Sequence, residues 1–429
     1  MDIINIAIIG MGTVGQGVAI MLLEQKDFLE RQLGCKVILR RILEKYWQKE
    51  LDFDRGNIPI SDNWQDVLTD PDIHIVIESM GGIEPAKTFI SDALKSGKHV
   101  VTANKDLLAL HGQELFAIAE ASSADLYFEA SVCGAIPVLC ALRQNLASDP
   151  IKEVMGIVNG TTNYILTRMA DEGGDFSTIL ADAQRLGYAE ANPSSDVEGI
   201  DAGRKTAILS TLAFHSAVTL DDVYIEGITG ITREDILFAA QMDFVVKLLA
   251  ICKEVDGRIE ARVHPALLPN SHPLSAVKDT FNAVFIKGDH LDEVMLYGRG
   301  AGRFPTASAI LGDVMEIARN IRNNACGRLT KVSGRERGIV PIDDVETRFF
   351  LRVLLADKPG VLATVAKTLS KYNVSLSTVK QTALQGGDAE LVFVTHLVRE
   401  GDMREALAEL RSLDVMKRVI TVLRVEGVA

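Results

Sequence analysis

The chain has 429 residues, which is too long for one ordinary hydrophobic core and predicts two or three domains. A hydrophobic fraction of 47% and a charged fraction of 24% are typical of a soluble globular enzyme. The formal net charge of −13 argues against a nucleic-acid partner, because phosphate contacts require clustered Lys and Arg. Small-molecule chemistry is therefore the better expectation.

The cysteines and the apolar segments indicate in which cellular compartment the protein is expected. None of the cysteines forms a Cys-x-x-Cys pair or a cluster with zinc-ligand spacing, which predicts reduced thiols in the cytoplasm. They are Cys35, Cys133, Cys140, Cys252 and Cys326. The N-terminus lacks the basic start and apolar core of a signal peptide, and no run approaches the roughly 18 apolar residues of a membrane span. We expect a cytoplasmic protein with no membrane partner.

An apolar run at residues 3–9 predicts a buried parallel strand, and GMGTVG follows it at the start of an amphipathic helix. A turn of this kind brings a pyrophosphate to the backbone and to the helix N-terminus. Its predicted cofactor contacts are Gly10, Gly12, Thr13, Val14 and Gly15. The next elements continue an alternating β/α pattern, with strands at residues 37–43, 74–78 and 99–102 and a helix at 84–96. Residues 1–130 are therefore predicted to form a doubly wound, Rossmann-type α/β domain.

The segment RRILEKYW after the second strand contains residues that could select the dinucleotide. Arg40, Arg41 and Lys45 could accept the 2′-phosphate of NADP, whereas Glu44 could accept the 2′-hydroxyl of NAD. We expect NADP, with NAD or dual use as the alternative.

Two predicted strand ends carry polar residues at the edge where open α/β sheets bind ligands. The segment ESMGG follows residue 77, and TANK ends at Lys105. Lys105 is either a surface lysine or a substrate contact beside the cofactor.

Residues 183–205 combine a polar loop with a charged pair. Asp201 and Lys205 are four residues apart, which places both on one helix face, where an acid can orient a catalytic ammonium. The bland alternative is a solvated ion pair. The polar residues before the pair are Glu190, Asn192, Pro193, Ser194, Ser195, Asp196 and Glu198.

Residues 131–325 are predicted to form an α+β substrate domain. Its expected helices are 177–186, 201–213 and 234–255, its expected strands are near 154–158, 259–263, 283–287 and 293–297, and a helix at 306–323 returns to the first domain. Polar residues 326–346 then predict a linker, and the pattern over residues 347–429 predicts a ferredoxin-like βαββαβ unit. The elements of that unit are expected at residues 347–355, 360–371, 374–381, 389–396, 402–413 and 419–425.

The sequence resembles homoserine dehydrogenases over almost its whole length. The family signature is met by Ala183, Gly187, Tyr188, Ala189, Asn192, Pro193, Asp196, Val197, Gly199, Asp201 and Lys205, and the supporting blocks are GMGTVG, TANK, YFEASVCGAIP, GIVNGTTNYIL and GRGAG. The resemblance implies reversible NAD(P)H-dependent reduction of aspartate 4-semialdehyde to homoserine, towards threonine and methionine. The sequence departs from the common pattern of this family at Asn192, Tyr46 and Arg299.

The resemblance also implies residue roles. Lys205 would transfer the proton, Asp201 would orient the substrate, and Lys105 would be a second cation beside substrate and nicotinamide. Glu190 and Asp196 would bind the substrate. Gly187 and Gly302 would let the backbone approach the cofactor or the substrate.

The turn YFEASVCGAIP implies a monovalent cation site, expected to hold Na+. Its ligands would be Glu129, Val132, Gly134 and Ile136, and the alternative is an ordinary turn with a structural Glu129. In the family, the sheet of the middle domain also forms a subunit interface, so a homodimer or homotetramer is expected.

Residues 347–429 resemble an ACT domain, an amino-acid-sensing module. Free backbone N–H groups at the helix start, at Gly360 and Val361, could receive an effector carboxylate, and Asp357 could take the effector's ammonium. The implied effector is threonine, and the alternative is a tail that serves only subunit pairing. Two rival functions are a dehydrogenase for another amino-acid semialdehyde and a catalytically silent amino-acid sensor.

Overall fold

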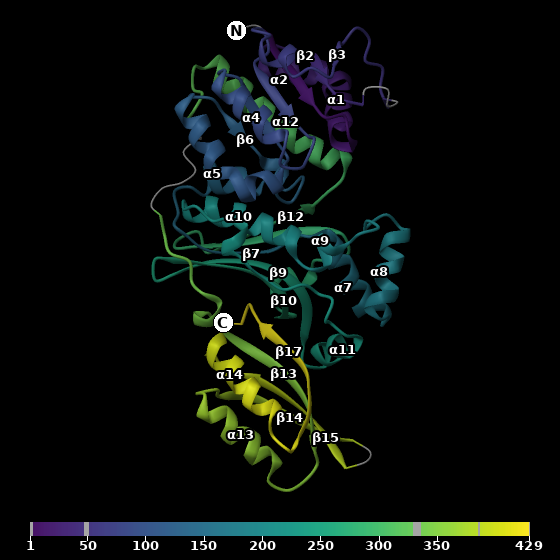
Figure 1. Ribbon diagram of the computed structural model, residues 1–429, viewed down its shortest axis with the longest axis vertical. Coiled ribbons are helices and arrows are strands. Elements are labelled where there is room, and N and C mark those ends of the chain that lie inside the picture. The colour runs from purple at the N-terminus through teal and green to yellow at the C-terminus, as the bar shows by residue number, and fades with distance from the viewer. Residues whose placement is uncertain (1–2, 47–50, 329–335, 385–386, 429) are drawn as a thin grey trace.

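The computed structural model describes residues 3–46, 51–328, 336–384 and 387–428. The molecule is elongated, with an N-terminal α/β part, a middle part and a C-terminal part following one another along its long axis (Figure 1). Two sheets run through these parts, one of six strands and one of eleven.

The six-stranded sheet is parallel throughout and has the order β3-β2-β1-β4-β5-β6. Its strands are β1 (Ile3–Ile9), β2 (Lys36–Leu43), β3 (Ile60–Ser61), β4 (Ile75–Glu78), β5 (His99–Thr102) and β6 (Leu126–Tyr127). Its helices are α1 (Thr13–Glu24), α2 (Lys26–Leu33), α3 (Gln65–Leu68), α4 (Ala86–Lys95) and α5 (Lys105–Ala121). This strand order is that of the Rossmann fold, as predicted.

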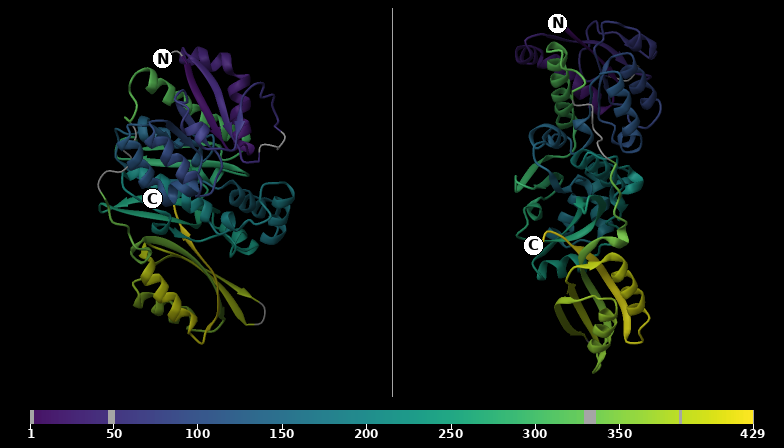
Figure 2. Two further views of the ribbon diagram at one scale, coloured as in Figure 1. Left: turned by 45° about the horizontal axis from the view of Figure 1, so that its top comes forward. Right: turned by 90° about the vertical axis from the view of Figure 1, so that its left-hand side faces the viewer.

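Helix α12 (Arg303–Arg322) returns from the middle of the molecule and packs on α1. Gly17 makes the close approach possible, because a Cβ atom at this position would lie 3.0 Å from the Arg303 carbonyl oxygen. Figure 2 shows the green α12 beside the purple N-terminal elements. The return helix of the sequence prediction is therefore confirmed, with a start three residues earlier than expected.

The middle part contributes β7 (Ile151–Ile157), β8 (Tyr224–Ile225), β9 (Phe244–Val255), β10 (Arg258–Pro269), β11 (Phe281–Gly288) and β12 (Glu293–Arg299). Its helices are α6 (Val138–Cys140), α7 (Gly160–Glu172), α8 (Phe176–Arg185), α9 (Ser194–Val197), α10 (Ile200–Phe214) and α11 (Arg233–Gln241). Helix α10 packs on β9 and β10, and its outer side meets α5 of the first sheet. This position places α10 between the two sheets.

The helix predicted for residues 234–255 is wrong beyond Gln241. Asp243 adopts the left-handed φ of +66° and ends the helix, and the next twelve residues form β9. They pair antiparallel with β10 along its whole length. The error has a simple cause, because a strand buried on both faces shows a continuous apolar run that periodicity cannot distinguish from a buried helix.

The C-terminal part forms the predicted βαββαβ unit. Its elements are β13 (Glu346–Ala356), α13 (Val361–Lys371), β14 (Leu376–Leu384), β15 (Asp388–Thr395), β16 (Val398–Arg399), α14 (Glu400–Arg411) and β17 (Met416–Val425). The order β17-β13-β15-β14 is ferredoxin-like. Strand β17 also pairs parallel with β10, so this unit continues the sheet of the middle part.

Buried ion pairs reinforce this junction. Glu426, just beyond β17, accepts a hydrogen bond of 2.7 Å from Arg262 of β10, and both side chains are almost fully buried. Arg352 of β13 likewise lies 2.9 Å from Asp235 of α11. The pKa of Glu426 would be raised by burial, but the charges of Arg262 and Lys253 outweigh this and lower it. None of the described helices is long and apolar enough to cross a membrane.

Candidate active site

The glycine-rich loop has the geometry that a dinucleotide requires. Gly10 has a φ of +88°, which only glycine adopts readily, and a Cβ atom on Gly15 would lie 2.1 Å from the Gly10 carbonyl oxygen. In contrast, no atom lies within 4 Å of the position of a Cβ on Gly12. Thr13 and Val14 form the first turn of α1 directly after it. The space above Gly12 and the helix start therefore fit a pyrophosphate.

The strand ends predicted to meet at the sheet edge do so. Ser79 donates a hydrogen bond of 2.9 Å to the Gly10 carbonyl, which holds the loop against the end of β4. The buried Glu78 accepts hydrogen bonds from the Thr102 hydroxyl at 2.5 Å and from the Met80 N–H at 2.8 Å. Burial raises the pKa of Glu78. These contacts fix the ESMGG and TANK segments side by side.

The residues considered for cofactor selection lie in different surroundings. Arg40 is held by Asp70 and Asp72, each at 2.8 Å, at the opposite end of β4 from the loop. Arg41 is 3.9 Å from Asp66. Glu44 accepts a 2.7 Å hydrogen bond from the Met11 N–H within the glycine-rich loop. The ammonium of Lys45 lies 5.7 Å from the centre of the Tyr46 ring.

Lys105 is the first residue of α5, and the preceding residue fixes its position. The Asn104 side chain accepts a hydrogen bond from the Leu107 N–H and so caps the helix. The same side chain donates a 2.7 Å bond to the Gly82 carbonyl. The Lys105 ammonium lies 3.3 Å from Asp201 Oδ1. Lys105 is therefore a member of the site rather than an isolated surface lysine.

The pair of Asp201 and Lys205 is not a solvated ion pair. Lys205 Nζ is 2.7 Å from Asp201 Oδ2 and donates a second bond of 2.7 Å to the Val158 carbonyl. The side chain of Asp201 is 8% exposed and that of Lys205 is 11% exposed. One buried carboxylate of α10 thus holds two ammonium groups, from α10 and α5.

Electrostatics keep Asp201 and Lys205 charged. Burial alone would raise the pKa of Asp201, but the charges of Lys205 and Lys105 outweigh it and hold the pKa below its usual range. Burial alone would lower the pKa of Lys205, but the Asp201 charge outweighs it and leaves the pKa raised. Lys205 is therefore held in its ammonium form.

Asn159 is a site residue that the sequence reasoning missed. Its Nδ2 atom donates to Asp201 Oδ2 at 2.9 Å and to Asp196 Oδ1 at 2.7 Å. Its Oδ1 atom accepts from the Thr162 N–H and caps α7. The signal was present in the block GIVNGTTNYIL, because an asparagine before a helix is a common N-cap. Asn159 thereby links the predicted substrate contact Asp196 to the charged centre.

The remaining predicted substrate and cofactor residues lie on the loop after α8, on α9 and before α12. Asp196 is half-buried on α9, and burial raises its pKa. Glu190 and Gly187 are exposed on the loop after α8, and Gly187 has a φ of +78°. Gly302, with a φ of +125°, precedes α12.

The turn that contains Glu129 has a buried carboxylate. Glu129 begins the short helix η1 (Glu129–Ser131), and its oxygens accept bonds from the Leu139 and Cys140 N–H groups at 2.8 Å and 2.6 Å. Burial raises the pKa of Glu129 to about 7. Val132, Gly134 and Ile136 follow, and a Cβ on Gly134 would lie 2.6 Å from the Gly300 carbonyl oxygen of the GRGAG segment.

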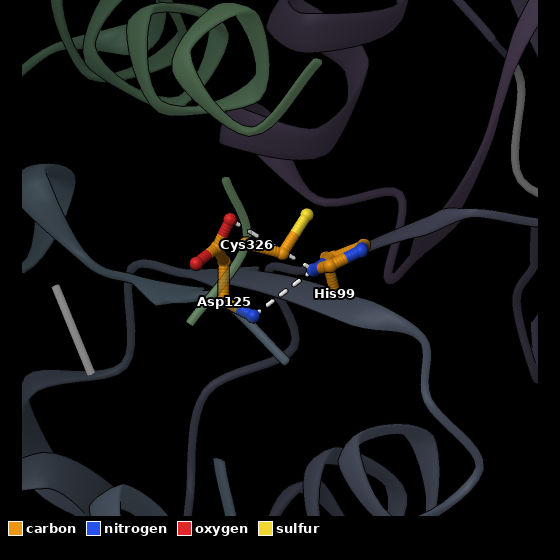
Figure 3. A group of neighbouring side chains, drawn as sticks. All are labelled: His99, Asp125 and Cys326. Carbon is orange, nitrogen blue, oxygen red and sulfur yellow. Dashed lines mark hydrogen bonds and ion pairs between the residues drawn. The ribbon is translucent and has the colours of Figure 1, made fainter. Parts of the chain in front are cut away.

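A second group of metal-binding residue types lies at the far edge of the first sheet. Figure 3 shows His99, Asp125 and Cys326, whose donor atoms all lie within 4.8 Å of one another. His99 Nδ1 accepts the Asp125 N–H at 2.9 Å, and the Asp125 carboxylate accepts bonds from Gly327 and Asn320 at 2.7 Å and 2.9 Å. These donor atoms are used in joining the end of α12 to the sheet, which is a structural role.

The predicted effector residues lie at the start of α13. Asp357 and Gly360 are exposed, Gly360 has a φ of +88°, and Val361 begins the helix. Gln381 of β14 donates a 3.4 Å hydrogen bond to Asp357.

Comparison with known proteins gives the same reading of the three parts. Residues 10–129 match the family model "Homoserine dehydrogenase, NAD binding domain", residues 137–315 match "Homoserine dehydrogenase", and residues 349–415 match "ACT domain". A homoserine dehydrogenase of Bacillus subtilis is 42% identical over 429 residues, covering 100% of this chain and 99% of that protein. The chain belongs to the homoserine dehydrogenase family.

Further relatives agree over the full length. A homoserine dehydrogenase of Corynebacterium glutamicum is 44% identical, covering 99% of this chain and 96% of that protein. The crystal structure of a homoserine dehydrogenase from Thiobacillus denitrificans matches with a TM-score of 0.93 and 37% identity, covering 99% of this chain and 98% of that chain. A hyperthermophilic archaeal homoserine dehydrogenase mutant in complex with NADPH matches with a TM-score of 0.63 and 27% identity, covering 73% of this chain and 97% of that chain.

These findings confirm the enzyme class, the nicotinamide cofactor and the ACT domain. The protein is an NAD(P)-dependent homoserine dehydrogenase with a C-terminal ACT domain. A catalytically silent sensor is also disfavoured by the site, which retains Lys105, Asp201 and Lys205 in contact.

Proposed function

We propose that Lys205 moves the proton in the reduction of aspartate 4-semialdehyde and that the shared Asp201 carboxylate positions it. The single observation that carries the proposal is the pair of ammonium groups around Asp201, with Nζ atoms 2.7 Å and 3.3 Å from its two oxygens. When bound, the nicotinamide supplies the hydride. The residues of this chain supply binding, orientation and the proton.

In the reductive direction, the Lys205 ammonium donates a proton to the alkoxide oxygen that forms from the aldehyde. The raised pKa of Lys205 keeps the donor charged until that oxygen becomes basic. Its hydrogen bond to the Val158 carbonyl holds the ammonium in one direction. In the oxidative direction, the neutral amine accepts the hydroxyl proton of homoserine. Lys105, on the other side of Asp201, stabilises the developing negative charge.

Carboxylates on the loop before α10 would hold the substrate ammonium. Glu190 is exposed and Asp196 is half-buried, so a cation arriving from solvent can reach both residues. Asn159 orients Asp196 towards the charged centre. Gly187 and Gly302 leave room for the backbone to approach the cofactor or the substrate.

We propose NADP as the preferred cofactor, with Arg41 and Lys45 at its 2′-phosphate. Arg40 is committed to Asp70 and Asp72, and Glu44 accepts a backbone N–H, which leaves Arg41 and Lys45 as the other cations of this segment. The archaeal relative solved with NADPH supports the choice. Replacement of Arg41 by Ala should raise the KM for NADPH about tenfold or more and leave the KM for NADH nearly unchanged.

The turn at Glu129 would hold a monovalent cation, proposed to be Na+. An all-oxygen donor set of the Glu129 carboxylate and the carbonyls of Val132, Gly134 and Ile136 suits a hard ion. A bound cation would also hold ionised a carboxyl group whose pKa burial raises to about 7. The melting temperature at equal ionic strength in NaCl and in tetramethylammonium chloride tests this site without an activity assay.

We propose threonine as an effector at Asp357, Gly360 and Val361, in a cytoplasmic homodimer or homotetramer. We divide the chain into a nucleotide domain (residues 1–130), a substrate domain (131–325), a linker (326–346) and an ACT domain (347–429). Steady-state kinetics of homoserine oxidation with NAD and with NADP, each with and without threonine, tests cofactor preference and inhibition together.

Replacement of Lys205 by Ala tests the central role. Turnover should fall about 100-fold to 10,000-fold, as expected for loss of a general acid, while NADPH still binds in a fluorescence titration. Lys152, which forms an exposed pair with Asp289, provides the control Lys152→Ala. Near-normal turnover of the Lys205 variant would reject the assignment.

A further inference from the structure

A cavity of about 300 Å³ lies at the junction between the ACT domain and the substrate domain. Helix α14 and strands β13 and β17 form one side, and β8 of the substrate domain and the short helix η5 (Ile342–Asp344) form the other. Its volume is at the lower end of the range of small-molecule sites. None of the predicted effector contacts lines it.

Apolar and charged side chains both line the cavity, and two of the charged ones, Glu400 and Arg424, are buried. The apolar side chains are Ile342, Phe349, Met403, Leu407 and Val422, and the charged ones are Glu226, Asp343, Glu400, Arg404, Arg411 and Arg424. This division suits a small ligand with one hydrocarbon end and one charged end.

One arginine that lines the cavity forms no ion pair with another described residue. Arg424 lies 2.7 Å from Glu226 and also pairs with Glu400, and Arg404 pairs with Asp343. Arg411, at the end of α14, is exposed and has no ion-pair or hydrogen-bond partner among the described residues. The unpaired guanidinium favours a ligand with a carboxylate, since guanidinium and carboxylate groups match in geometry.

We infer that this junction cavity binds a small aliphatic amino acid, with its carboxylate on Arg411 and its side chain against Leu407 and Val422. Glu226 is the most accessible acid of the buried Arg424 group, at 40% side-chain exposure, and it receives the ligand ammonium. The ligand thereby spans α14 of the ACT domain and β8 of the substrate domain.

The substrate-domain wall of the cavity packs directly on the catalytic elements. Tyr224 and Glu226 flank Ile225, and a Cβ atom on Gly203 of α10 would lie 2.4 Å from the Ile225 side chain. One residue further, a Cβ on Gly227 would lie 2.3 Å from the Val197 carbonyl oxygen of α9. These segments are packed so closely that there is no room even for an added Cβ atom between them. A displacement of β8 therefore moves α9 and the start of α10.

These two helices carry Asp196 and Asp201. Occupation of the junction cavity therefore changes both the KM for homoserine and the kcat. This kinetic consequence rests on the proposed roles of Asp196 and Asp201, whereas the binding itself does not.

The test is isothermal titration calorimetry of the full-length enzyme with L-valine, L-isoleucine and L-threonine, without turnover. Arg411→Gln should weaken binding of the tightest probe about tenfold or more, as expected for loss of a charge-assisted contact. Arg418→Gln is the matched control, because Arg418 is an exposed arginine of β17 that does not line the cavity. Ile342→Trp fills the cavity from its rim and should also abolish binding. Circular dichroism confirms that each variant is folded.

Asp357→Asn separates this cavity from the effector site proposed at the start of α13. Binding that is lost in Arg411→Gln and Ile342→Trp but kept in Asp357→Asn supports the junction cavity. Binding that is lost in Asp357→Asn alone, or the absence of heat with all three probes, overturns it.

Discussion

The guanidinium of Arg204 lies 3.0 Å from the carboxylate of Asp106. In the sequence, Asp106 directly follows Lys105 and Arg204 directly precedes Lys205. The pair therefore joins α5 and α10, the two helices that carry the site lysines. Arg204 also donates a 3.1 Å hydrogen bond to the Ser195 hydroxyl on α9. Among the described residues, neither forms a hydrogen bond or an ion pair with Asp201, so we expect the pair to position the residues that do.

Arg204→Ala should therefore lower the kcat of homoserine oxidation about tenfold or more, because small displacements of reacting groups are costly. Its melting temperature should change little, since the pair is partly exposed, with 25% and 36% side-chain exposure. Arg185→Ala is the control, because Arg185 pairs with Asp182 on the exposed side of α8. Equal kcat values for the two variants would contradict the positioning role.

Asp201→Asn should shift the pH profile of homoserine oxidation to lower pH. The Asp201 charge raises the pKa of Lys205 against the effect of burial, and the proposed oxidation requires the neutral amine of Lys205. Loss of the charge lowers that pKa, so the rising limb of log kcat against pH moves towards neutrality. The profile is measured with saturating cofactor in both enzymes. If the rising limb of log kcat against pH does not move, the group that titrates in this limb is not Lys205.

Gly12→Ala should separate cofactor binding from folding. The φ of Gly12 is −70° and no atom lies within 4 Å of an added Cβ, so the free protein tolerates the change. The methyl group would instead occupy the space proposed for the pyrophosphate. We expect an unchanged melting temperature and an NADPH Kd at least about tenfold higher, measured by fluorescence titration. Gly312→Ala on the α12 surface, where a Cβ also meets no atom, is the control.

Glu426→Gln should destabilise the protein by about 1 to 3 kcal/mol, because it leaves the buried Arg262 with only one of its two charged partners, Glu260. The folded-state pKa of Glu426 is lowered, so its contribution is present above the unfolded value of about 4.3 and is lost as the pH falls through the folded value. The difference in the free energy of unfolding between the wild type and the variant should therefore become smaller at acid pH. Urea denaturation followed by circular dichroism at neutral and acid pH measures it. Glu409→Gln is the control, because Glu409 forms an exposed ion pair with Lys371, and it should leave the midpoint of urea denaturation nearly unchanged.

Local patterns were sufficient for much of this fold. The glycine spacing at residues 10–15 predicts the loop because Gly10 and Gly15 answer local steric demands and Gly12 leaves open space above the helix start. The βαββαβ order of the C-terminal unit can be predicted from the alternation of patterns alone. The limit is reached at residues 244–255, where burial on both faces removes the periodicity.

The site was predictable in its charged residues and not in their connections. The spacing of Asp201 and Lys205 follows from helical geometry, but the contact with Lys105 depends on how α5 meets α10. The bridging role of Asn159 likewise arises from a tertiary approach of α7 to α9 and α10. Such contacts between distant segments leave no mark in the local sequence.

The parallel pairing of β10 with β17 means that the sensor and the catalyst are not exchangeable modules. Deletion of residues 345–429 would expose an unprotected edge on β10 and remove Glu426, one of the two acids that pair with Arg262, so the truncated enzyme would be prone to aggregate. The two proposed effector sites are therefore better tested by single substitutions at Arg411 or Asp357 than by cutting the chain. The same pairing constrains evolution, because a regulatory domain that completes its neighbour's sheet can change its ligand more easily than it can be lost.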